Sequence, residues 1–227
     1  MPDDVGRLAL SAIPAEWTFK DNKVAAGFEA HVREQLPWYT LATGAVAHVA
    51  RHYIPEGGLI YDLGASTGNV GRAIEPTLDA RGARLIPVEV SAEMAAHYSG
   101  PQVGRLIIAD VRDVEFEPFD LAVAFLTLMF VPVADRPALL TRLRAACRPG
   151  GAIVILDKTE AQRGYAATVI WRMALAGKVA TGVAPEEIVA KELSLGGVQR
   201  PINPAVLGDD AIEFFRFGDF AGWLIEA

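Results

Sequence analysis

The residues best suited to chemistry in this sequence form a glycine-rich stretch, Asp62-Leu63-Gly64-Ala65-Ser66-Thr67-Gly68, which follows a short apolar run and precedes a helix-like pattern. Gly64 and Gly68 have no Cβ, so the backbone at these positions can approach a ligand closely. Free N–H groups at the positive end of the following helix would add attraction for that ligand. The pattern therefore predicts a buried strand, a tight turn and a helix that together hold a nucleotide-like cofactor.

The spacing of the small residues indicates which cofactor is bound. A dinucleotide fingerprint has glycines at its first, third and sixth positions, but counting from Gly64 the latter two are Ser66 and Asn69. The stretch also lacks the Gly-Lys-Ser/Thr of a nucleoside-triphosphate loop. The S-adenosylmethionine (SAM) signature, acidic-x-Gly-x-Gly-x-Gly, fits with only its middle glycine replaced, by Ser66. SAM is therefore the predicted cofactor, and the alternative is a plain strand-to-helix connection.

Acids follow the first three predicted strands. Glu89 lies 21 residues beyond Gly68, close to the separation expected for a carboxylate that accepts hydrogen bonds from ribose hydroxyls. Asp110 is predicted to accept a hydrogen bond from the adenine amino group, or else to cap a turn. Asp62 is predicted to orient the loop or to meet the ammonium group of the cofactor. Three acids at successive strand ends indicate a cofactor site more specifically than any one of these acids would alone.

Composition restricts the classes of partner. The chain has 227 residues, 52% of them hydrophobic, and a net charge of -7. The acidic balance does not favour nucleic acid, although it leaves a local basic patch open, so a small-molecule acceptor is predicted. The single cysteine, Cys147, excludes an intramolecular disulfide and a multi-cysteine zinc site. His48 and His52 have helical spacing but no acidic partner, so no metal site is predicted.

The sequence contains no pattern typical of secretion or membrane insertion. The N-terminus, Met1-Pro2-Asp3-Asp4, lacks the apolar core of a signal peptide. The longest apolar run, 121–133, is too short to span a bilayer and contains Thr127 and Pro132. The expectation is a cytoplasmic protein without membrane contact.

Strand-like and helix-like patterns alternate through the middle of the chain. Strands are predicted over 59–63, 84–88, 105–109, 121–125 and 152–156, the last preceded by a turn at 149–151. Helices are predicted over 69–79, 92–98 and 134–147. This alternation indicates an α/β fold with a doubly wound, mostly parallel, Rossmann-like sheet. Ligands bind such sheets beyond the carboxyl ends of the strands, here at Asp62, Glu89, Asp110, Phe125 and Asp157.

The remaining segments surround this predicted sheet. Residues 1–19 read as an irregular arm, and helices over 21–35 and 40–53 are predicted to cover the cofactor cleft. Helices over 161–179 and 184–195 form an insertion after the fifth strand, and strands over 211–217 and 220–225 form an antiparallel hairpin. The chain is therefore predicted to be one domain, 1–227. Its parts are a helical cover at 20–54, a cofactor-binding core at 55–157, an acceptor or lid insertion at 158–210 and a closing hairpin at 211–227.

The chain resembles the class I SAM-dependent methyltransferases, and among them the carboxy-SAM synthases that serve tRNA wobble-uridine modification. The resemblance runs from about Trp17 to the C-terminus. It is carried by Trp17-Thr18-Phe19, Leu36-Pro37-Trp38-Tyr39, Tyr61-Asp62-Leu63-Gly64-Ala65-Ser66, Asp110-Val111-Arg112-Asp113, Leu126-Thr127-Leu128-Met129-Phe130, Arg148-Pro149-Gly150-Gly151 and Phe217-Gly218. The serine at position 66 is shared with this branch.

The resemblance implies roles for individual residues. Tyr39 reaches the cofactor from the N-terminal cover, and Glu89 binds the ribose. Asp110 and Val111 bracket the adenine. The loop residues Gly64, Ala65 and Ser66 line the cofactor, and the remaining predicted contacts are Asp62, Gly68, Val90 and Phe125.

Two positions depart from the family pattern. Phe125 stands where the family has an asparagine, and Glu192 aligns with the family's arginine that holds the carboxylate of carboxy-SAM. An acid cannot replace that arginine, and Lys191 or Arg200 would replace its fork imperfectly. The sequence therefore predicts a SAM-dependent methyltransferase with a small-molecule acceptor. The alternatives are a carboxy-SAM synthase-like enzyme and a non-catalytic SAM-binding protein.

The sequence identifies the catalytic residues only weakly. Methyl transfer from a sulfonium mainly requires alignment and exclusion of water, so a general base is optional. Asp157, Lys158 and Tyr165 are the candidates to contact the acceptor, and ordinary solvated charges or a packed ring are equally good interpretations of them. A homodimer is an open expectation.

Overall fold

The computed structural model describes residues 18–20, 22–101, 105–160 and 163–227. This part of the chain contains a seven-stranded sheet with the order β3-β2-β1-β4-β5-β7-β6. Its strands are β1 (Leu59–Leu63), β2 (Arg84–Glu89), β3 (Ile107–Ile108), β4 (Phe119–Phe125), β5 (Cys147–Lys158), β6 (Ile212–Phe217) and β7 (Phe220–Glu226). Strands β1 to β5 run parallel, and β7 is antiparallel to both of its neighbours. The predicted mostly parallel sheet with a C-terminal antiparallel hairpin is confirmed.

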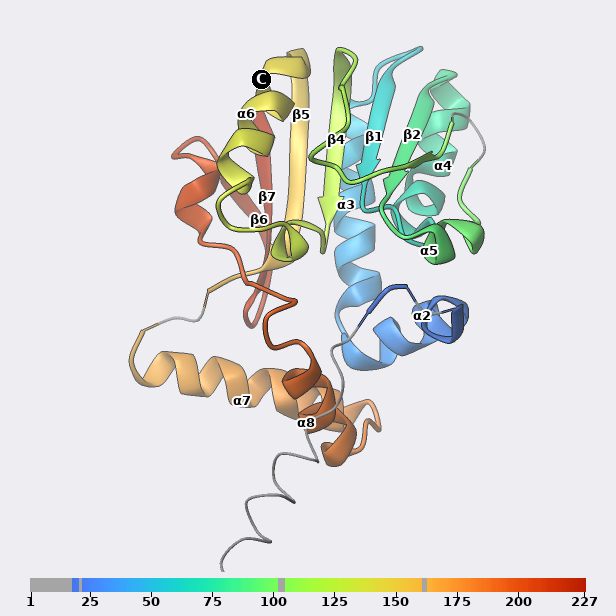
Figure 1. The fold of residues 1–227 in the computed structure, drawn as a ribbon. Coiled ribbons are helices and arrows are strands. Elements are labelled where there is room, and N and C mark those ends of the chain that lie inside the picture. The colour runs from blue at the N-terminus through green and yellow to red at the C-terminus, as the bar shows by residue number, and fades with distance from the viewer. Residues whose placement is uncertain (1–17, 21, 102–104, 161–162) are drawn as a thin grey trace, which may run out of the picture.

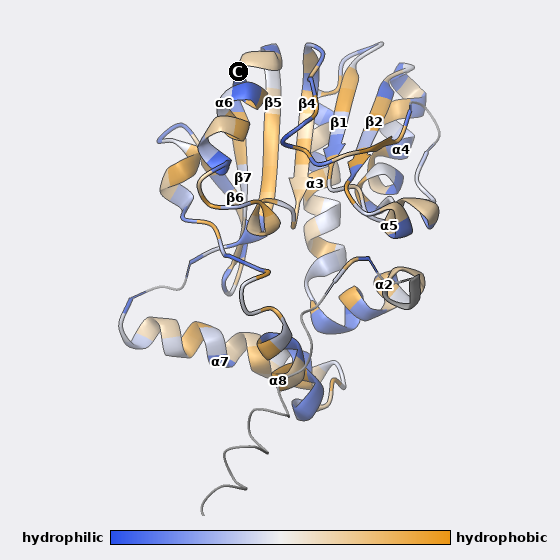
Figure 2. Ribbon diagram, viewed as in Figure 1, coloured by the Kyte–Doolittle hydropathy of each residue, from blue (hydrophilic) through white to orange (hydrophobic). Residues whose placement is uncertain are grey.

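Helices cover both faces of the sheet because the central strands are apolar on both sides. Helices α3 (Tyr39–Tyr53) and α4 (Asn69–Arg81) lie behind the sheet in Figure 1, and α6 (Arg136–Ala146) lies in front. Alternate strand residues divide between two cores: Ile60 packs with the α3 and α4 side, whereas Tyr61 packs with the α6 side. The strands are correspondingly hydrophobic along most of their length (Figure 2). This two-sided burial matches a doubly wound fold.

Three helices lie beyond the carboxyl ends of the parallel strands, below the sheet in Figure 1. They are α2 (Asn22–Gln35), α7 (Tyr165–Ala180) and α8 (Pro185–Ser194). The short elements are α5 (Ala92–Ala96), η1 (Leu128–Phe130) and η2 (Pro204–Leu207). The predicted N-terminal helices and the helical insertion after the fifth strand are therefore present.

Two strand predictions need correction. The third strand is only Ile107–Ile108 instead of 105–109, because it lies at the edge of the sheet and pairs solely with Val88 and Glu89. The predicted turn at 149–151 lies inside β5, where the register against β4 shifts between Phe119 and Leu121. A Cβ on Gly151 would lie 2.6 Å from the carbonyl oxygen of Asp120, so the backbones approach closely at this irregularity.

Helix ends also differ from the sequence prediction. Helix α5 ends at Ala96 instead of 98, because the chain turns so that the Ser99 amide donates to the Thr67 carbonyl at 3.0 Å. Helix α7 begins at Tyr165, after Gly164 with a φ of +65°. Residues 161–162 of the predicted helix and 1–17 of the predicted arm lie outside the described residues. Within the described ranges, no helix combines the length and the apolar character needed to cross a membrane.

Candidate functional site

The loop between β1 and α4 has a backbone that only small residues suit. Gly64 has a φ of +73°, and a Cβ there would lie 2.5 Å from Thr127 Oγ1. Gly68 has a φ of +94°, and its Cβ would meet the Gly100 amide nitrogen at the same distance. Ser66 adopts a φ of 51° although it is not glycine. Left-handed backbone at a non-glycine residue costs energy and is concentrated at binding sites.

A cavity of about 250 Å³ lies at this end of the sheet. It is enclosed by the loop after β1, by α2, by the segment after β4 and by α7 and α8. Loop and strand-end residues that line it are Asp62, Gly64, Ala65, Ser66, Asn69, Val70, Glu89, Val90, Phe125, Leu126 and Thr127. Its polar and charged lining near α7 and α8 consists of Lys158, Lys178, Lys191, Glu192, Gln199 and Asp219.

Two buried polar atoms, one at the end of β1 and one in the loop that follows it, are notable within the described ranges. Asp62 Oδ2 and Ser66 Oγ have no hydrogen-bond partner among the described residues, and both residues line the cavity. Burial raises the pKa of Asp62 to about 7, and the nearby Glu89 adds to this shift. Buried polar atoms without partners are rare in folded proteins. A cationic or hydroxylated ligand at this point would satisfy both of them.

Glu89 lies at the same end of the cavity and binds two backbone amides. Its Oε2 accepts from the Ser66 amide and its Oε1 accepts from the Ser91 amide, both at 2.8 Å. Burial raises the pKa of Glu89, while these two amides oppose that rise. Each carboxylate oxygen retains a second lone pair. Glu89 can therefore accept two ligand hydroxyls while it holds the loop in place.

Aromatic side chains close the side of the cavity formed by the N-terminal helices. Tyr39 is buried at the start of α3, and its ring meets the Phe125 ring edge-on with centroids 5.3 Å apart. Burial raises the pKa of the Tyr39 hydroxyl above its ordinary value. Four residues of α2 also line the cavity: Phe28, His31, Val32 and Gln35. The two N-terminal helices thus cover the site, with α2 forming most of that cover.

Three of the sequence-predicted cofactor residues do not line the cavity. Gly68 lies behind the loop, against Gly100. Val111 is buried in the core on the α6 side of the sheet. Asp110 forms a two-point contact with Arg112, whose Nε and Nη2 lie 3.0 and 2.8 Å from its oxygens. This hydrogen bonding lowers the pKa of Asp110 and directs both of its oxygens towards Arg112, and the adenine contact of Asp110 stays a prediction.

The three weak catalytic candidates are separated by the fold. Lys158 lines the cavity. Asp157 is fully buried outside it, where its carboxylate accepts from the Lys158 and Met129 amides at 2.8 and 3.1 Å. Burial raises the pKa of Asp157 to about 7. Tyr165 is 74% exposed at the start of α7 and does not contribute to the cavity.

Glu192 lies in a compact charge cluster in the cavity wall. Its carboxylate is 3.0 Å from Lys178 Nζ and 3.9 Å from Lys158 Nζ. Burial opposes ionisation of Glu192, but Lys158 and Lys178 together hold its pKa below the ordinary value. Asp219 lies 3.7 Å from Lys158 Nζ on the other side. Arg200, the arginine nearest in sequence, is exposed and does not line the cavity.

Lys191 completes the cluster. It lines the cavity, and burial lowers its pKa to about 7, with further lowering by the positive charge of Lys178. The sequence predicts that the helix over 21–35 covers the cleft, but it does not single out its lining residues or Lys178. The shared helical face of Phe28 and Val32 was a usable signal for α2, whereas no local pattern marks Lys178 as a partner of Glu192.

The chemistry of the site fits SAM. Asp62 would face the ammonium group at the amino-acid end of SAM, and Glu89 would face its ribose hydroxyls. Val90 and the aromatic side chains of the N-terminal cover would contact the apolar parts of the cofactor. At Gly64, the Thr127 side chain leaves no room for a Cβ atom, so the loop backbone itself forms this part of the cavity wall. Among the described residues, no group of three or more histidine, cysteine, aspartate or glutamate side chains is arranged to bind a metal.

Comparison with known sequences agrees with this geometry. Residues 60–151 match the family model described as a methyltransferase domain. The carboxy-S-adenosyl-L-methionine synthase of Shewanella sp. (strain ANA-3) is 31% identical over 211 residues, which cover 89% of this chain and 86% of that protein. The protein of the same name from Staphylococcus epidermidis is 27% identical over 220 residues, covering 92% of this chain and 96% of its own.

Solved structures share the fold at low identity. Human N-acetylserotonin methyltransferase in complex with SAM has a TM-score of 0.60 and 14% identity, covering 97% of this chain and 62% of its own. The complex of DhpI with SAH also has a TM-score of 0.60, with 18% identity over 89% of this chain and 91% of its own. Both carry the cofactor or its product on the same architecture.

Proposed function

The chain belongs to the carboxy-S-adenosyl-L-methionine synthase family, and we propose that this member transfers the methyl group of unmodified SAM to a small-molecule acceptor. It is a SAM-dependent methyltransferase by its domain and its fold. We choose unmodified SAM because the carboxylate of Glu192 lies in the cavity wall and its pKa is held below the ordinary value. A second carboxylate brought into this partly desolvated cavity would be repelled by it.

The residues around the cavity suit a reaction that needs alignment more than covalent assistance. Bound SAM supplies a methyl group already activated on a sulfonium. Asp62 and Glu89 would hold the two polar ends of the cofactor, and the Tyr39–Phe125 pair would exclude water from the reacting atoms. Lys191, with a pKa of about 7, would accept a proton from an acidic acceptor at neutral pH.

The lining of the cavity supports a mainly apolar acceptor that carries one polar group. The acceptor side combines Trp171, Leu175 and Leu195 with the charge cluster around Glu192. The net charge of -7 favours a small molecule over a polynucleotide.

A carboxy-SAM synthase activity is the second candidate. It is favoured by the 31% identity over 89% of the chain. The cluster also contains Lys158, Lys178 and the partly protonated Lys191, so its positive charge at least matches the two carboxylates of Glu192 and Asp219. A lysine offers a point charge instead of the two-point fork of an arginine, so it would bind a carboxylate less selectively.

Competition between the two cofactors tests the proposal. The purified protein would be titrated with SAM, and with carboxy-SAM as a competitor, while mass spectrometry identifies any ligand that co-purifies. Tighter binding of SAM is expected. A clear preference for carboxy-SAM that is lost in Lys191→Ala would overturn the proposal in favour of the second candidate. The Arg200→Ala variant is the matched control, since Arg200 does not line the cavity.

The predicted homodimer and cytoplasmic location stay predictions. Exposed apolar residues on α7, namely Tyr165, Val169 and Met173, support an interface on that helix. Light scattering of the purified protein, compared with that of a Val169→Glu/Met173→Glu variant, would test the dimer.

A further inference from the structure

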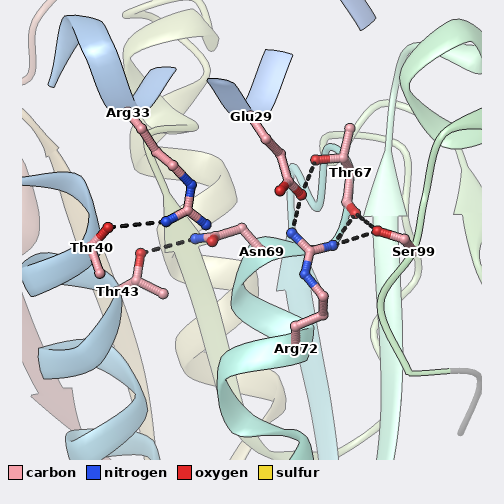
Figure 3. Close-up of polar contacts among 8 residues, drawn as sticks. All are labelled: Glu29, Arg33, Thr40, Thr43, Thr67, Asn69, Arg72 and Ser99. Atoms are coloured by element: carbon pink, nitrogen blue, oxygen red, sulfur yellow. Dashed lines mark hydrogen bonds and ion pairs between the residues drawn. The ribbon is translucent and has the colours of Figure 1, made fainter. Parts of the chain in front are cut away.

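Arg72 joins three segments at the edge of the cofactor loop (Figure 3). From the first turn of α4, its Nη1 donates to the Thr67 carbonyl at 2.7 Å and to Ser99 Oγ at 2.6 Å. Its Nη2 forms an ion pair with Glu29 Oε1 on α2. Thr67 Oγ1 donates to the same Glu29 oxygen at 3.1 Å, so the loop and the helix are linked twice.

The linked segments both contribute residues to the lining of the cavity. Thr67 lies between Ser66, which lines the cavity, and Gly68, which closes the loop. Glu29 follows Phe28 in α2, and His31 lies two residues further on; both of these neighbours line the cavity. Neither Glu29 nor Arg72 lines it themselves. Their contact therefore joins two lining segments of the cavity without itself forming part of the lining.

We infer that Arg72 and Glu29 are positioning residues for the cofactor: their ion pair holds α2 over the glycine-rich loop and sets how long a bound cofactor remains. Movement of α2 away from the loop would widen this side of the cavity, and it would break the pair. The inference concerns cofactor binding only, so it holds for any methyl acceptor.

The geometry makes this pair stronger than an ordinary surface contact. An isolated exposed pair contributes little, since solvent screens it and two long side chains must be ordered. Here the same guanidinium also binds the backbone of the loop, so Arg72 is already ordered when it meets Glu29. Its planar fork serves several acceptors at once. Both side chains are only about one-third exposed, with values of 29% and 39%.

A second arginine, Arg33, attaches α2 to a different part of the structure than Arg72 does. Arg33 Nη1 donates to Thr40 Oγ1 at 3.0 Å, which links α2 to the first turn of α3 (Figure 3). That contact does not involve the glycine-rich loop. Loss of the Glu29 contact would therefore leave α2 attached to α3 while it frees the helix from the loop.

The test is the dissociation rate of S-adenosylhomocysteine, measured by stopped-flow displacement with excess SAM. In Glu29→Gln the rate is expected to rise about threefold to tenfold, which lies within the range for the net contribution of one ordinary hydrogen bond. Arg72→Lys retains the charge without the fork and should give a smaller increase. Raising the salt from about 0.05 to about 0.5 M should accelerate dissociation from the wild type but not from Glu29→Gln.

Glu34→Gln is the matched control, because it removes one exposed acid from the same helix. It should dissociate as the wild type does. The inference is overturned if Glu29→Gln has the wild-type dissociation rate and salt dependence, or if Glu34→Gln changes them equally. Thermal unfolding of the ligand-free variants separates this effect from a general loss of stability, since a purely structural role would lower the melting temperature without a selective rise in the dissociation rate.

Discussion

Nζ of Lys178 on α7 lies 3.0 Å from Oε1 of Glu192 on α8, so the two helices of the insertion are joined by an ion pair inside the cavity wall. The contact keeps Glu192 ionised, because Lys158 and Lys178 lower its pKa against the effect of burial. An acid is thereby held negatively charged at the position where the family resemblance implies a carboxylate-binding arginine.

Replacing Glu192 by glutamine should shift the choice of cofactor. The substitution keeps the size of the side chain and removes the charge that repels a carboxylate, while Lys158, Lys178 and Lys191 remain. Affinity for carboxy-SAM relative to SAM should rise about tenfold, the size of one hydrogen bond to a charged group. Competitive titration would measure it, with the exposed Glu186→Gln in the same helix as control. An unchanged ratio would remove Glu192 from cofactor selection.

Removing the Glu89 carboxylate should weaken SAM binding by about 1.5–3 kcal/mol, the range for hydrogen bonds to a charged group. Loss of the amide contacts to Ser66 and Ser91 would add to the loss of the predicted ribose contacts. Calorimetric titration of Glu89→Ala, beside the exposed Glu115→Ala, would measure it. If a folded Glu89→Ala variant binds SAM normally, Glu89 does not hold the ribose.

A side chain at Gly64 should abolish SAM binding for two separable reasons. The φ of +73° strains any L-residue, and the added Cβ meets Thr127 Oγ1 at 2.5 Å. Gly57 has a φ of +64° with open space around it, so Gly57→Ala isolates the strain alone. Gly64→Val should fold and lose binding, whereas Gly57→Ala should lose only about 1–2 kcal/mol of unfolding free energy. Normal binding by Gly64→Val would make the loop a simple connection.

Asp62 should make both stability and SAM binding depend on pH. Its pKa of about 7 in the folded chain exceeds the unfolded value of about 4, so the folded state binds more protons between these values. The free energy of unfolding should therefore fall as the pH rises from about 4 to about 7. Asp157 contributes with the same sign, so the difference between the wild type and Asp62→Asn is the informative quantity.

Proton release on ligand binding checks the same residue independently. If the SAM ammonium pairs with Asp62, binding lowers the pKa of that carboxyl and releases a proton near neutral pH. Calorimetry in buffers of different ionisation enthalpy would detect the release in the wild type and its loss in Asp62→Asn. Equal proton release by both proteins would show that Asp62 does not meet the ammonium group.

The amino-acid sequence by itself determined the parallel sheet and the cofactor loop. Apolar strands of the right length alternate with helices, and Gly64 and Gly68 stand where the backbone has a positive φ. These features depend on residues close together in the chain, which is why spacing alone predicts them. The likeness carried by Tyr61 to Ser66 gave the family correctly for the same reason.

Only the tertiary structure decided which side chains share the cavity. Asp110 and Glu89 look alike in sequence, yet Arg112 engages the first and two backbone amides orient the second. The contacts of Glu29 with Arg72 and of Lys178 with Glu192 join different helices. Such contacts depend on how helices pack and which way side chains point, and packing is set by the whole core instead of by neighbouring residues.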